Sequence, residues 1–149
     1  MGAGLLSLTI LSPEKNFYEG DVREVIFSTP MGRLGVMTGH APMVAAVSEG
    51  VLELLIGDEW KIAAVGQGFS EIAYDKAEFF VDTAEWAEEI DAARARQALE
   101  RAEQRIRSNI NRVEYLRTQA AMSRALARLK ASGSAAAAAP APGQGGGKK

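Results

Sequence analysis

The sequence predicts an α+β fold, in which an N-terminal antiparallel β-sandwich is followed by a C-terminal antiparallel α-helical hairpin. Three observations predict it: short alternating apolar runs between turns fill residues 5–82, a helical period follows them, and the net charge changes sign near the same point. We therefore expect a sandwich over residues 1–86, a hairpin over residues 87–131, and a disordered tail rich in Ala, Pro and Gly over residues 132–149.

The strands of the expected sandwich are indicated by apolar side chains at every second position. Residues 6–10, 25–28 and 52–56 have this alternation, which places one face of each strand in a core. The last of these runs ends at the polar turn 57–59, and residues 60–65 then form the returning arm of a hairpin. The first half of the chain is therefore expected to consist of strands alone.

Turn residues recur at short intervals through the same region, and this spacing favours an all-β sandwich or barrel. Phe79 and Val81 mark the last expected strand. No gap between strands is long enough for the crossover helix that a parallel sheet requires, so we expect antiparallel pairing. The turn signals lie at residues 20–21, 30–32, 39–42, 49–50, 57–58 and 66–68.

Two helices are expected after the sandwich. Asp91 is the expected N-cap of the first helix, because its carboxylate can accept a hydrogen bond from a free backbone N–H. Ser and Asn side chains at 108–111 predict a break, and a second helix from about Arg112 to Lys130 then completes an αα-hairpin. The expected apolar stripes are Ala95, Ala98, Leu99, Ala102 and Ile106 on the first helix, and Tyr115, Met122, Leu126 and Leu129 on the second.

The expected hairpin is rich in Ala, which favours helix formation but buries little apolar area. We therefore expect it to be held less firmly than the sandwich and to be the moving part of the protein.

The charges of the chain are divided between its two parts. Residues 1–91 carry 16 acidic and 5 basic side chains, whereas residues 92–149 carry 3 acidic and 12 basic side chains. The arginines of the hairpin are too numerous to pair with its own acids, so we expect an acidic partner. A sandwich with a basic helical arm for nucleic acid is the alternative, although Tyr115 is the only aromatic residue of the hairpin.

No catalytic constellation is evident. The chain has no cysteine and a single histidine, His40, so thiolate and His-rich metal sites are excluded, and we expect no metal. An enzyme that uses His40 with neighbouring acids is the weakest hypothesis. We expect instead a structural turn formed by Gly39, His40, Ala41 and Pro42, with the imidazole ring hydrogen-bonded to the backbone.

Two further classes of site are not indicated. Residues 66–68 lack the third glycine of a dinucleotide fingerprint and precede a strand rather than a helix. No signal peptide is expected, and the longest apolar run is shorter than the ~20 residues that span a bilayer. Any association with a membrane is therefore expected to occur through a partner.

Several segments resemble the epsilon subunit of bacterial F-type ATP synthases, over nearly the whole chain up to about Lys130. Residues 35–43, built around Gly-His-Ala-Pro, resemble the most recognisable signature of that family, with Thr38 where the family often has Pro. The other matching segments, which lie in the family's order and spacing, are residues 50–55, 66–71, 82–85 and 90–95.

The resemblance implies a non-catalytic central-stalk subunit that couples proton or sodium ion flow to rotation and ATP synthesis. Its partners would be the gamma subunit, the c-subunit ring, and the alpha and beta subunits, with no nucleic acid. The hairpin would either fold onto the sandwich or extend along the shaft and inhibit ATP hydrolysis. The implied location is peripheral, on the cytoplasmic face of the bacterial cell membrane.

The resemblance also implies two sets of site residues. No cofactor is expected, but some members of the family bind regulatory ATP when the hairpin is folded down. The matching nucleotide-binding candidates are Ile90, Asp91, Arg94, Ala95, Arg124 and Arg128. The alternative is that Asp91 only caps a helix and Arg94 is only a surface charge. A basic face for partner binding would consist of Arg101, Arg105, Arg112, Arg117, Arg124 and Arg128.

Overall fold

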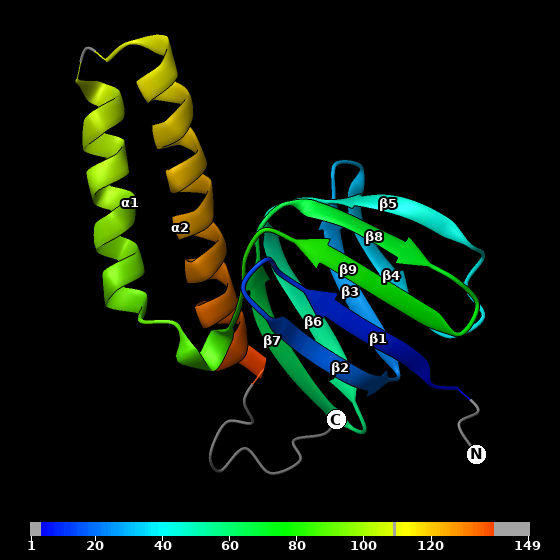
Figure 1. Ribbon diagram of the computed structural model, residues 1–149. Helices are drawn as coiled ribbons and strands as arrows, with labels where there is room; N and C mark the ends of the chain where they lie inside the picture. Colours follow the sequence, from blue (N-terminus) through cyan, green and yellow to red (C-terminus); the bar gives the residue numbers. More distant parts are fainter. Residues whose placement is uncertain (1–3, 109, 139–149) are drawn as a thin grey trace, which may run out of the picture.

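The computed structural model describes residues 4–108 and 110–138, which form a β-sandwich with a helical hairpin beside it (Figure 1). The sandwich consists of two five-stranded sheets, with strand orders β2-β1-β9-β8-β5 and β10-β7-β6-β3-β4. The strands are β1 (Leu6–Leu11), β2 (Asn16–Val22), β3 (Glu24–Thr29), β4 (Gly32–Val36), β5 (Met43–Val47), β6 (Gly50–Ile56), β7 (Glu59–Val65), β8 (Gly68–Ile72), β9 (Lys76–Val81) and β10 (Ala84–Trp86). The α+β fold predicted from the sequence is confirmed.

The pairing of β1 with β9 is an exception to the expected antiparallel order. These two strands run parallel, with Ser7 opposite Lys76 and Leu11 opposite Phe80, whereas the other paired strands are antiparallel. A parallel pair needs a long connection, and here the strands β2 to β8 provide it in place of a crossover helix. A short strand, β10, also follows the last strand expected from the sequence and pairs with β7.

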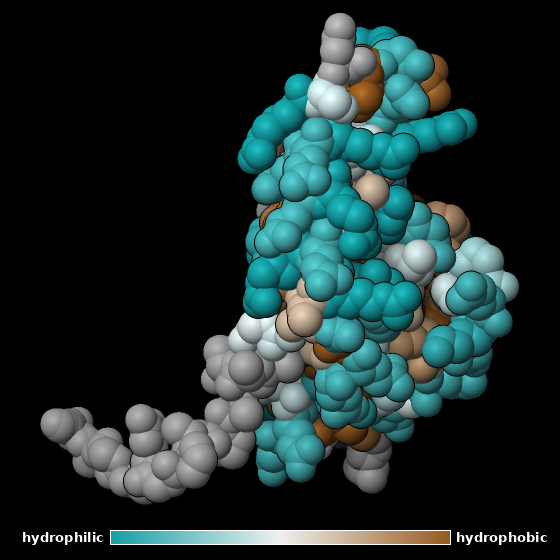
Figure 2. All heavy atoms as spheres, turned by 90° about the vertical axis from the view of Figure 1, so that its left-hand side faces the viewer, coloured by the Kyte–Doolittle hydropathy of each residue, from teal (hydrophilic) through white to brown (hydrophobic). Residues whose placement is uncertain are grey.

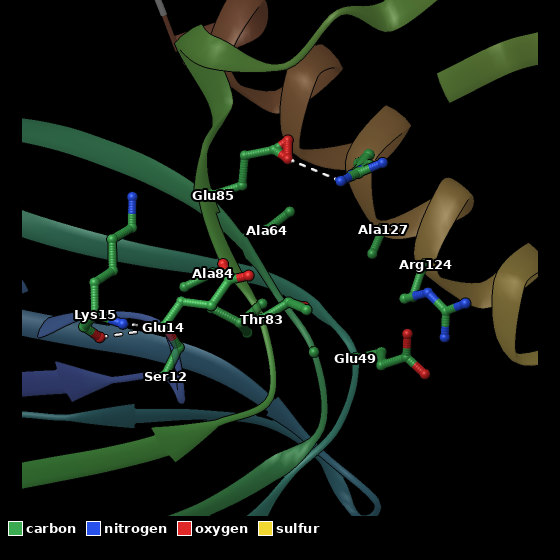
Figure 3. A pocket seen from close by; sticks show the side chains of 13 residues that line it. Ser12, Glu14, Lys15, Glu49, Ala64, Thr83, Ala84, Glu85, Arg124 and Ala127 are labelled. Carbon is green, nitrogen blue, oxygen red and sulfur yellow. Dashed lines mark hydrogen bonds and ion pairs between the residues drawn. The ribbon is translucent and has the colours of Figure 1, made fainter. Parts of the chain in front are cut away.

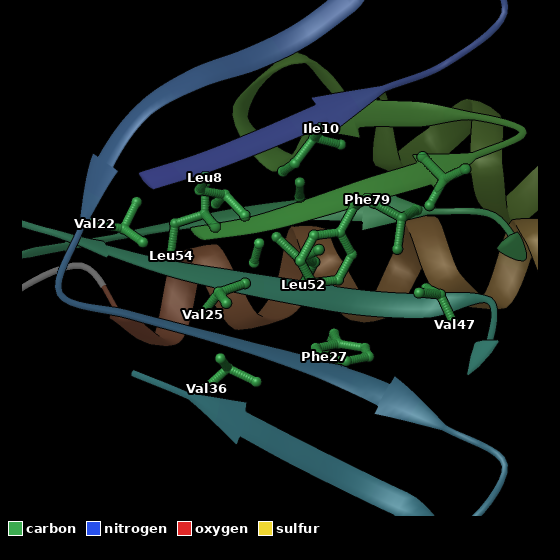
Figure 4. Packing of buried hydrophobic residues seen from close by; sticks show 14 of the residues in the cluster. Leu8, Ile10, Val22, Val25, Phe27, Val36, Val47, Leu52, Leu54 and Phe79 are labelled. Atoms are coloured by element: carbon green, nitrogen blue, oxygen red, sulfur yellow. The ribbon is translucent and has the colours of Figure 1, made fainter. Parts of the chain in front are cut away.

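The core lies between the two sheets, as the alternation of apolar residues predicts (Figure 4). Leu6, Leu8 and Ile10 of β1 are fully buried. Phe27 and Phe79, from opposite sheets, pack edge to face with ring centroids 4.8 Å apart. This geometry is favoured by the aromatic quadrupole. Because a shift of one residue would turn each apolar face outward, the core also fixes the register of the strands.

The turn between β6 and β7 is the hairpin turn expected at residues 57–59. Gly57 has φ 62°, whereas Asp58 does not have a positive φ. This pattern is typical of a type II′ turn, in which glycine is needed at the first central position. Arg23 Nη1 donates to Asp58 Oδ1 at 2.8 Å and to the Gly57 carbonyl at 3.2 Å. These two hydrogen bonds from a distant side chain also stabilise the turn.

The helical hairpin consists of α1 (Ala92–Arg107) and α2 (Arg112–Ala138), and a short 3-10 helix, η1 (Ala87–Glu89), precedes it. The predicted break between the helices is confirmed. Asp91 Oδ1 accepts a hydrogen bond from the Arg94 backbone N–H at 3.1 Å, so the expected N-cap is formed. Asn111 caps α2 in the same way, by accepting from the Glu114 N–H at 2.9 Å.

The second helix is longer than the sequence predicts. The sequence predicts that it ends near Lys130 and that the tail begins at residue 132, but α2 continues to Ala138. The reason is the run of alanines in this segment, since Ala has the highest intrinsic helix propensity. The rest of the expected disordered tail, residues 139–149, lies outside the described residues.

The buried face of α2 differs from the stripe expected of it. Ala95 and Ala102 of α1 are buried as predicted, but Tyr115 and Leu126 of α2 are exposed. Figure 1 shows that α2 lies between α1 and the sandwich, so α2 has two contact faces, whereas a heptad seam assumes one. The residues of α2 that are buried instead are Thr118, Ala125, Ala127 and Ala131.

Candidate functional site

The junction between α2 and the sandwich is the candidate functional site, because it holds the hairpin against the sandwich. Its apolar part is a small cluster in which Ala131 of α2 packs with Ile62 and Ala64 of β7 and with Ala87 of η1. Ala131 is completely buried. Small side chains let the helix approach the sheet closely, but they remove little apolar area from water. The apolar contact is therefore weak compared with the sandwich core.

An ion pair adds to this contact. Arg128 Nη2 lies 3.1 Å from Glu85 Oε1, which joins α2 to β10 (Figure 3). The two side chains are 52% and 30% exposed. Pairs with this exposure are worth about 0–1 kcal/mol, because water and salt screen them. The ion pair orients the helix but does not hold it strongly.

The start of the hairpin segment is fixed to the sandwich by Trp86, the last residue of β10. Its ring lies 4.4 Å from the ring of Phe17, centroid to centroid, and the Lys61 ammonium lies 4.4 Å from the Trp86 ring centroid. Lys61 Nζ is also 3.7 Å from Glu88 Oε1 of η1. These contacts anchor the chain as far as η1, so a movement of the helices would begin after this short helix.

A second carboxylate of the sandwich faces α2. Glu49, between β5 and β6, points toward Arg124 across a cavity of about 450 Å³ (Figure 3). Its Oε2 atom is buried and has no hydrogen-bond partner. Burial raises the pKa of Glu49, the charge of Arg124 partly offsets this effect, and the charge of Asp82 adds to it.

The acidic partner expected for the basic hairpin is therefore, in part, the chain's own sandwich. Arg128 is paired with Glu85, and Arg124 is faced by Glu49. Sequence reasoning did not identify these two glutamates as site residues. The opposite charges of the two parts of the chain were the signal that could have indicated them.

The structure brings together five of the six nucleotide-binding candidates. Ile90, Asp91, Arg94, Ala95 and Arg128 line one cleft of about 430 Å³ at the base of the hairpin, whereas Arg124 lines the neighbouring cavity beside Glu49. The cleft has no excess of positive charge, because its lining contains three carboxylates and three guanidinium groups. These are Glu85, Glu89 and Asp91, and Arg94, Arg101 and Arg128.

The arginines of the expected partner-binding face lie in different places. Arg124 and Arg128 face the sandwich, and Arg112 is exposed at the start of α2. Arg101, Arg105 and Arg117 line a cleft between the two helices. Figure 2 views the molecule from the side of the hairpin and shows that this side is largely hydrophilic. The arginines expected to form one partner-binding face therefore lie in three places: against the sandwich, at the exposed start of α2, and in the cleft between the helices.

The turn around His40 has structural hydrogen bonds. His40 Nδ1 lies 2.8 Å from the Ala41 carbonyl oxygen, and the Gly39 N–H donates to the Tyr74 carbonyl at 2.6 Å. Gly39 has φ 89°, a conformation that favours glycine. Within residues 4–108 and 110–138, no group of three or more His, Asp or Glu side chains is placed to hold a metal ion. No helix in the same ranges is long and apolar enough to cross a membrane.

Comparison with protein-family models defines the class. The model for the β-sandwich domain of the ATP synthase delta/epsilon chain matches residues 5–87, and the model for its long α-helix domain matches residues 88–133. The chain belongs to the delta/epsilon family of ATP synthase subunits. The family resemblance seen in the sequence is confirmed.

Similar curated proteins define the member of the family more closely. The ATP synthase epsilon chain of Ruminiclostridium cellulolyticum is 42% identical over 125 residues, covering 84% of this chain and 93% of the relative. The epsilon chain of Caldanaerobacter subterraneus is 41% identical over 124 residues, covering 83% and 90%. The chloroplastic epsilon chain of Spinacia oleracea is 34% identical over 127 residues, covering 85% and 95%. These matches place the chain among the epsilon chains, which are non-catalytic subunits of the complex.

Solved structures show the same fold. A chain of the Euglena gracilis mitochondrial ATP synthase OSCP/F1/c-ring structure has a TM-score of 0.75 and 21% identity, with 90% of this chain and 82% of that chain covered. A chain of the Tetrahymena thermophila central stalk and c-ring has a TM-score of 0.55 and 16% identity, with 85% and 96% covered. The nucleic-acid alternative receives no support from these comparisons.

Proposed function

We propose that this epsilon chain works in the central stalk of an ATP synthase, where the sandwich couples ion flow to rotation and the hairpin restrains ATP hydrolysis. The hairpin would do so after it leaves the sandwich and extends toward the alpha and beta subunits. The family membership of the chain and the central-stalk and c-ring assemblies of its structural neighbours support this function.

The observation that carries the proposal is a difference in packing. The core inside the sandwich is more extensive than the contact between α2 and the sandwich. The sandwich is held by a continuous core between its sheets, whereas α2 is held on the sandwich by a small apolar cluster around Ala131 and by one partly exposed ion pair. A part of a protein with few buried contacts needs less free energy to open locally than the whole protein needs to unfold. The hairpin can therefore leave while the sandwich stays folded.

The sandwich has a surface suited to the gamma subunit and the c-subunit ring as partners. On the outer face of the first sheet, Val44 is 70% exposed and Phe69 is 45% exposed. Phe69 stacks on Phe80 of the neighbouring strand, with ring centroids 5.0 Å apart. Apolar groups gathered on a surface are typical of protein contacts. These contacts would keep the chain peripheral to the membrane, on its cytoplasmic face.

Regulatory ATP is proposed for the cleft that contains Arg94 and Arg128. The five candidate residues that line it together support this assignment. The internal charge balance of the cleft, and the use of Asp91 as a helix cap, both limit the affinity that it would have for a phosphate group.

The test is a complex assembled with a chain that ends at Glu89. The truncated chain should still purify with the gamma subunit, and ATP hydrolysis by the complex should rise. Unchanged hydrolysis would remove the inhibitory role of the hairpin. Loss of the truncated chain from the complex would instead contradict the role of the sandwich in assembly.

A further inference from the structure

The junction between α2 and the sandwich encloses a carboxyl group. Glu49 lies in the short connection between β5 and β6, at one wall of the cavity of about 450 Å³ (Figure 3). Arg124 and Ala127 of α2 line the same cavity, and Ala127 is only 6% exposed. Because α2 forms one wall of the cavity, the surroundings of Glu49 differ between the docked hairpin and a hairpin that has left the sandwich.

The carboxyl group of Glu49 lacks the partners that an ionised carboxylate needs. Its Oε2 atom is buried and accepts no hydrogen bond from the described part of the chain. Neither Glu49 nor Arg124 belongs to any of the four ion pairs within the described residues. A buried carboxylate without donors is costly when it is charged, and this cost falls when it takes up a proton. The docked hairpin therefore favours the neutral form of Glu49.

The charges around Glu49 come from the helix and from the sandwich. Burial has the largest effect and raises the pKa of Glu49, the charge of Arg124 lowers this pKa, and the charge of Asp82 raises it. Since burial outweighs the attraction of Arg124, departure of α2 should lower the pKa of Glu49. The other charged residues that line the cavity are Arg128 of α2, Glu85 of β10, and Glu14 and Lys15 of the connection between β1 and β2.

We propose that the docking of α2 on the sandwich takes up a proton at Glu49, so that acidification holds the hairpin down and a rising pH releases it. The proposal concerns the docking equilibrium of the chain itself. It does not rest on the proposed control of ATP hydrolysis, because it says only when the hairpin is released and not what the released hairpin does.

The sign of the effect follows from the two states of the hairpin. The docked state holds the proton of Glu49 more tightly than the released state does, so protonation favours docking. This contribution is complete below the ordinary pKa of a glutamate and is lost as the pH rises through the raised value in the docked state. A difference of one pKa unit between the two states changes their equilibrium about tenfold. One proton is therefore sufficient to shift a contact as small as the cluster around Ala131.

The experiment measures release of the hairpin by the reactivity of a single thiol, which is possible because the chain has no cysteine. Ala131→Cys places a thiol on the α2 side of the docking contact, and Ala64→Cys places one on the sandwich side. Ser123→Cys, at an exposed position of α2, gives a reference rate at each pH. Dithiodipyridine reacts with thiols in weakly acidic solution, so it can label all three. The labelling rate of a buried thiol relative to the reference rate measures the released fraction.

This relative rate should rise for both buried thiols as the pH increases above the ordinary glutamate pKa of about 4.3, by about tenfold for each unit of pKa difference between the docked and released states. In the Glu49→Gln background it should stay low at every pH, because glutamine resembles the protonated side chain. Glu14→Gln removes an exposed carboxylate from the same cavity and should keep the rise. Arg124→Gln removes the charge that opposes burial and should make the rise steeper.

A further control separates release of the hairpin from unfolding of the sandwich. Ala77→Cys places a thiol in the sandwich core, where the side chain is completely buried, and its labelling should show no such rise. An equal rise at this position would mean that the whole protein opens. If one thiol at the docking contact reacts at the reference rate at every pH, its substitution has released the helix, and the thiol on the other side decides.

Three outcomes would overturn the proposal. The first is a relative labelling rate that does not change with pH in the chain that retains Glu49. The second is a rise that persists unchanged in Glu49→Gln, because another group would then control docking. The third is an equal loss of the rise in Glu14→Gln and Glu49→Gln, which would mean that the overall charge of the cavity acts and not this one carboxyl group.

Discussion

Arg128 of α2 and Glu85 of β10 form an ion pair at 3.1 Å, and this pair joins the helical hairpin to the sandwich. Because both side chains are partly exposed, a double-mutant cycle of Arg128→Gln and Glu85→Gln should give a coupling energy of about 0.2–1 kcal/mol. Hydrogen exchange of the α2 amides measures it. A coupling energy above about 2 kcal/mol would mean that this pair, and not the alanine contact, dominates docking.

Ala131→Glu should release α2 from the sandwich. Ala131 is fully buried among apolar residues, so a carboxylate placed there would be without a partner, at a cost of several kcal/mol to the docked state. Trypsin should then cleave at the arginines of α2 faster than in the wild type. Ser123→Glu adds the same charge at an exposed position of α2 and should leave the cleavage rate unchanged. Equal rates for the two variants would contradict the assigned role of Ala131.

Asp91→Ala should destabilise α1 by about 1 kcal/mol, because the hydrogen bond to the Arg94 N–H is lost. Asp91→Ser keeps an oxygen that can cap the helix and should recover most of this loss. Hydrogen exchange in the first turn of α1 measures both changes. If the serine variant were as unstable as the alanine variant, the carboxylate would have a role beyond capping.

Glu49 should make stability depend on pH. Burial raises the pKa of Glu49, so the folded protein holds this proton more tightly than the unfolded chain does. Its favourable contribution is complete below the ordinary pKa of a glutamate and is lost as the pH rises through the raised value in the folded protein. As the pH rises above the ordinary glutamate pKa of about 4.3, the melting temperature of the wild type should therefore fall relative to that of Glu49→Gln.

The control for this prediction is Glu59→Gln, which changes an exposed glutamate at the start of β7. Its melting temperature should follow that of the wild type across the same pH range. A difference between the wild type and Glu49→Gln that stays constant with pH would show that the proton on Glu49 has no influence on folding.

Local patterns in the sequence predicted several strands and the start of α1, because their causes are local. The alternation in Leu6, Leu8 and Ile10 fixes one face of β1, and Asp91 caps the helix that immediately follows it. The parallel pairing of β1 with β9 was not predicted, because contacts between strands far apart in the chain leave no local pattern. The three-residue strand β10 is too short to show an alternation.

The candidate site could be predicted only in part for a related reason. The segment from Ile90 to Ala95 was identified as a unit, because its residues are adjacent in the chain. Glu49 and Arg124 face each other only because of the way in which α2 packs on the sandwich. The heptad seam expected for this helix did not predict that packing. The cleft between the helices likewise depends on which alanines of α1 and α2 face each other.

The most direct test is the steady-state rate of ATP hydrolysis by assembled complexes that contain three forms of the chain. Hydrolysis should be fastest with the chain truncated after Glu89, slower with the wild type, and slowest with Ala131→Glu, whose hairpin is released but present. Hydrolysis with Ala131→Glu that equals or exceeds the wild-type rate would contradict the claim that the released hairpin is the inhibitory state.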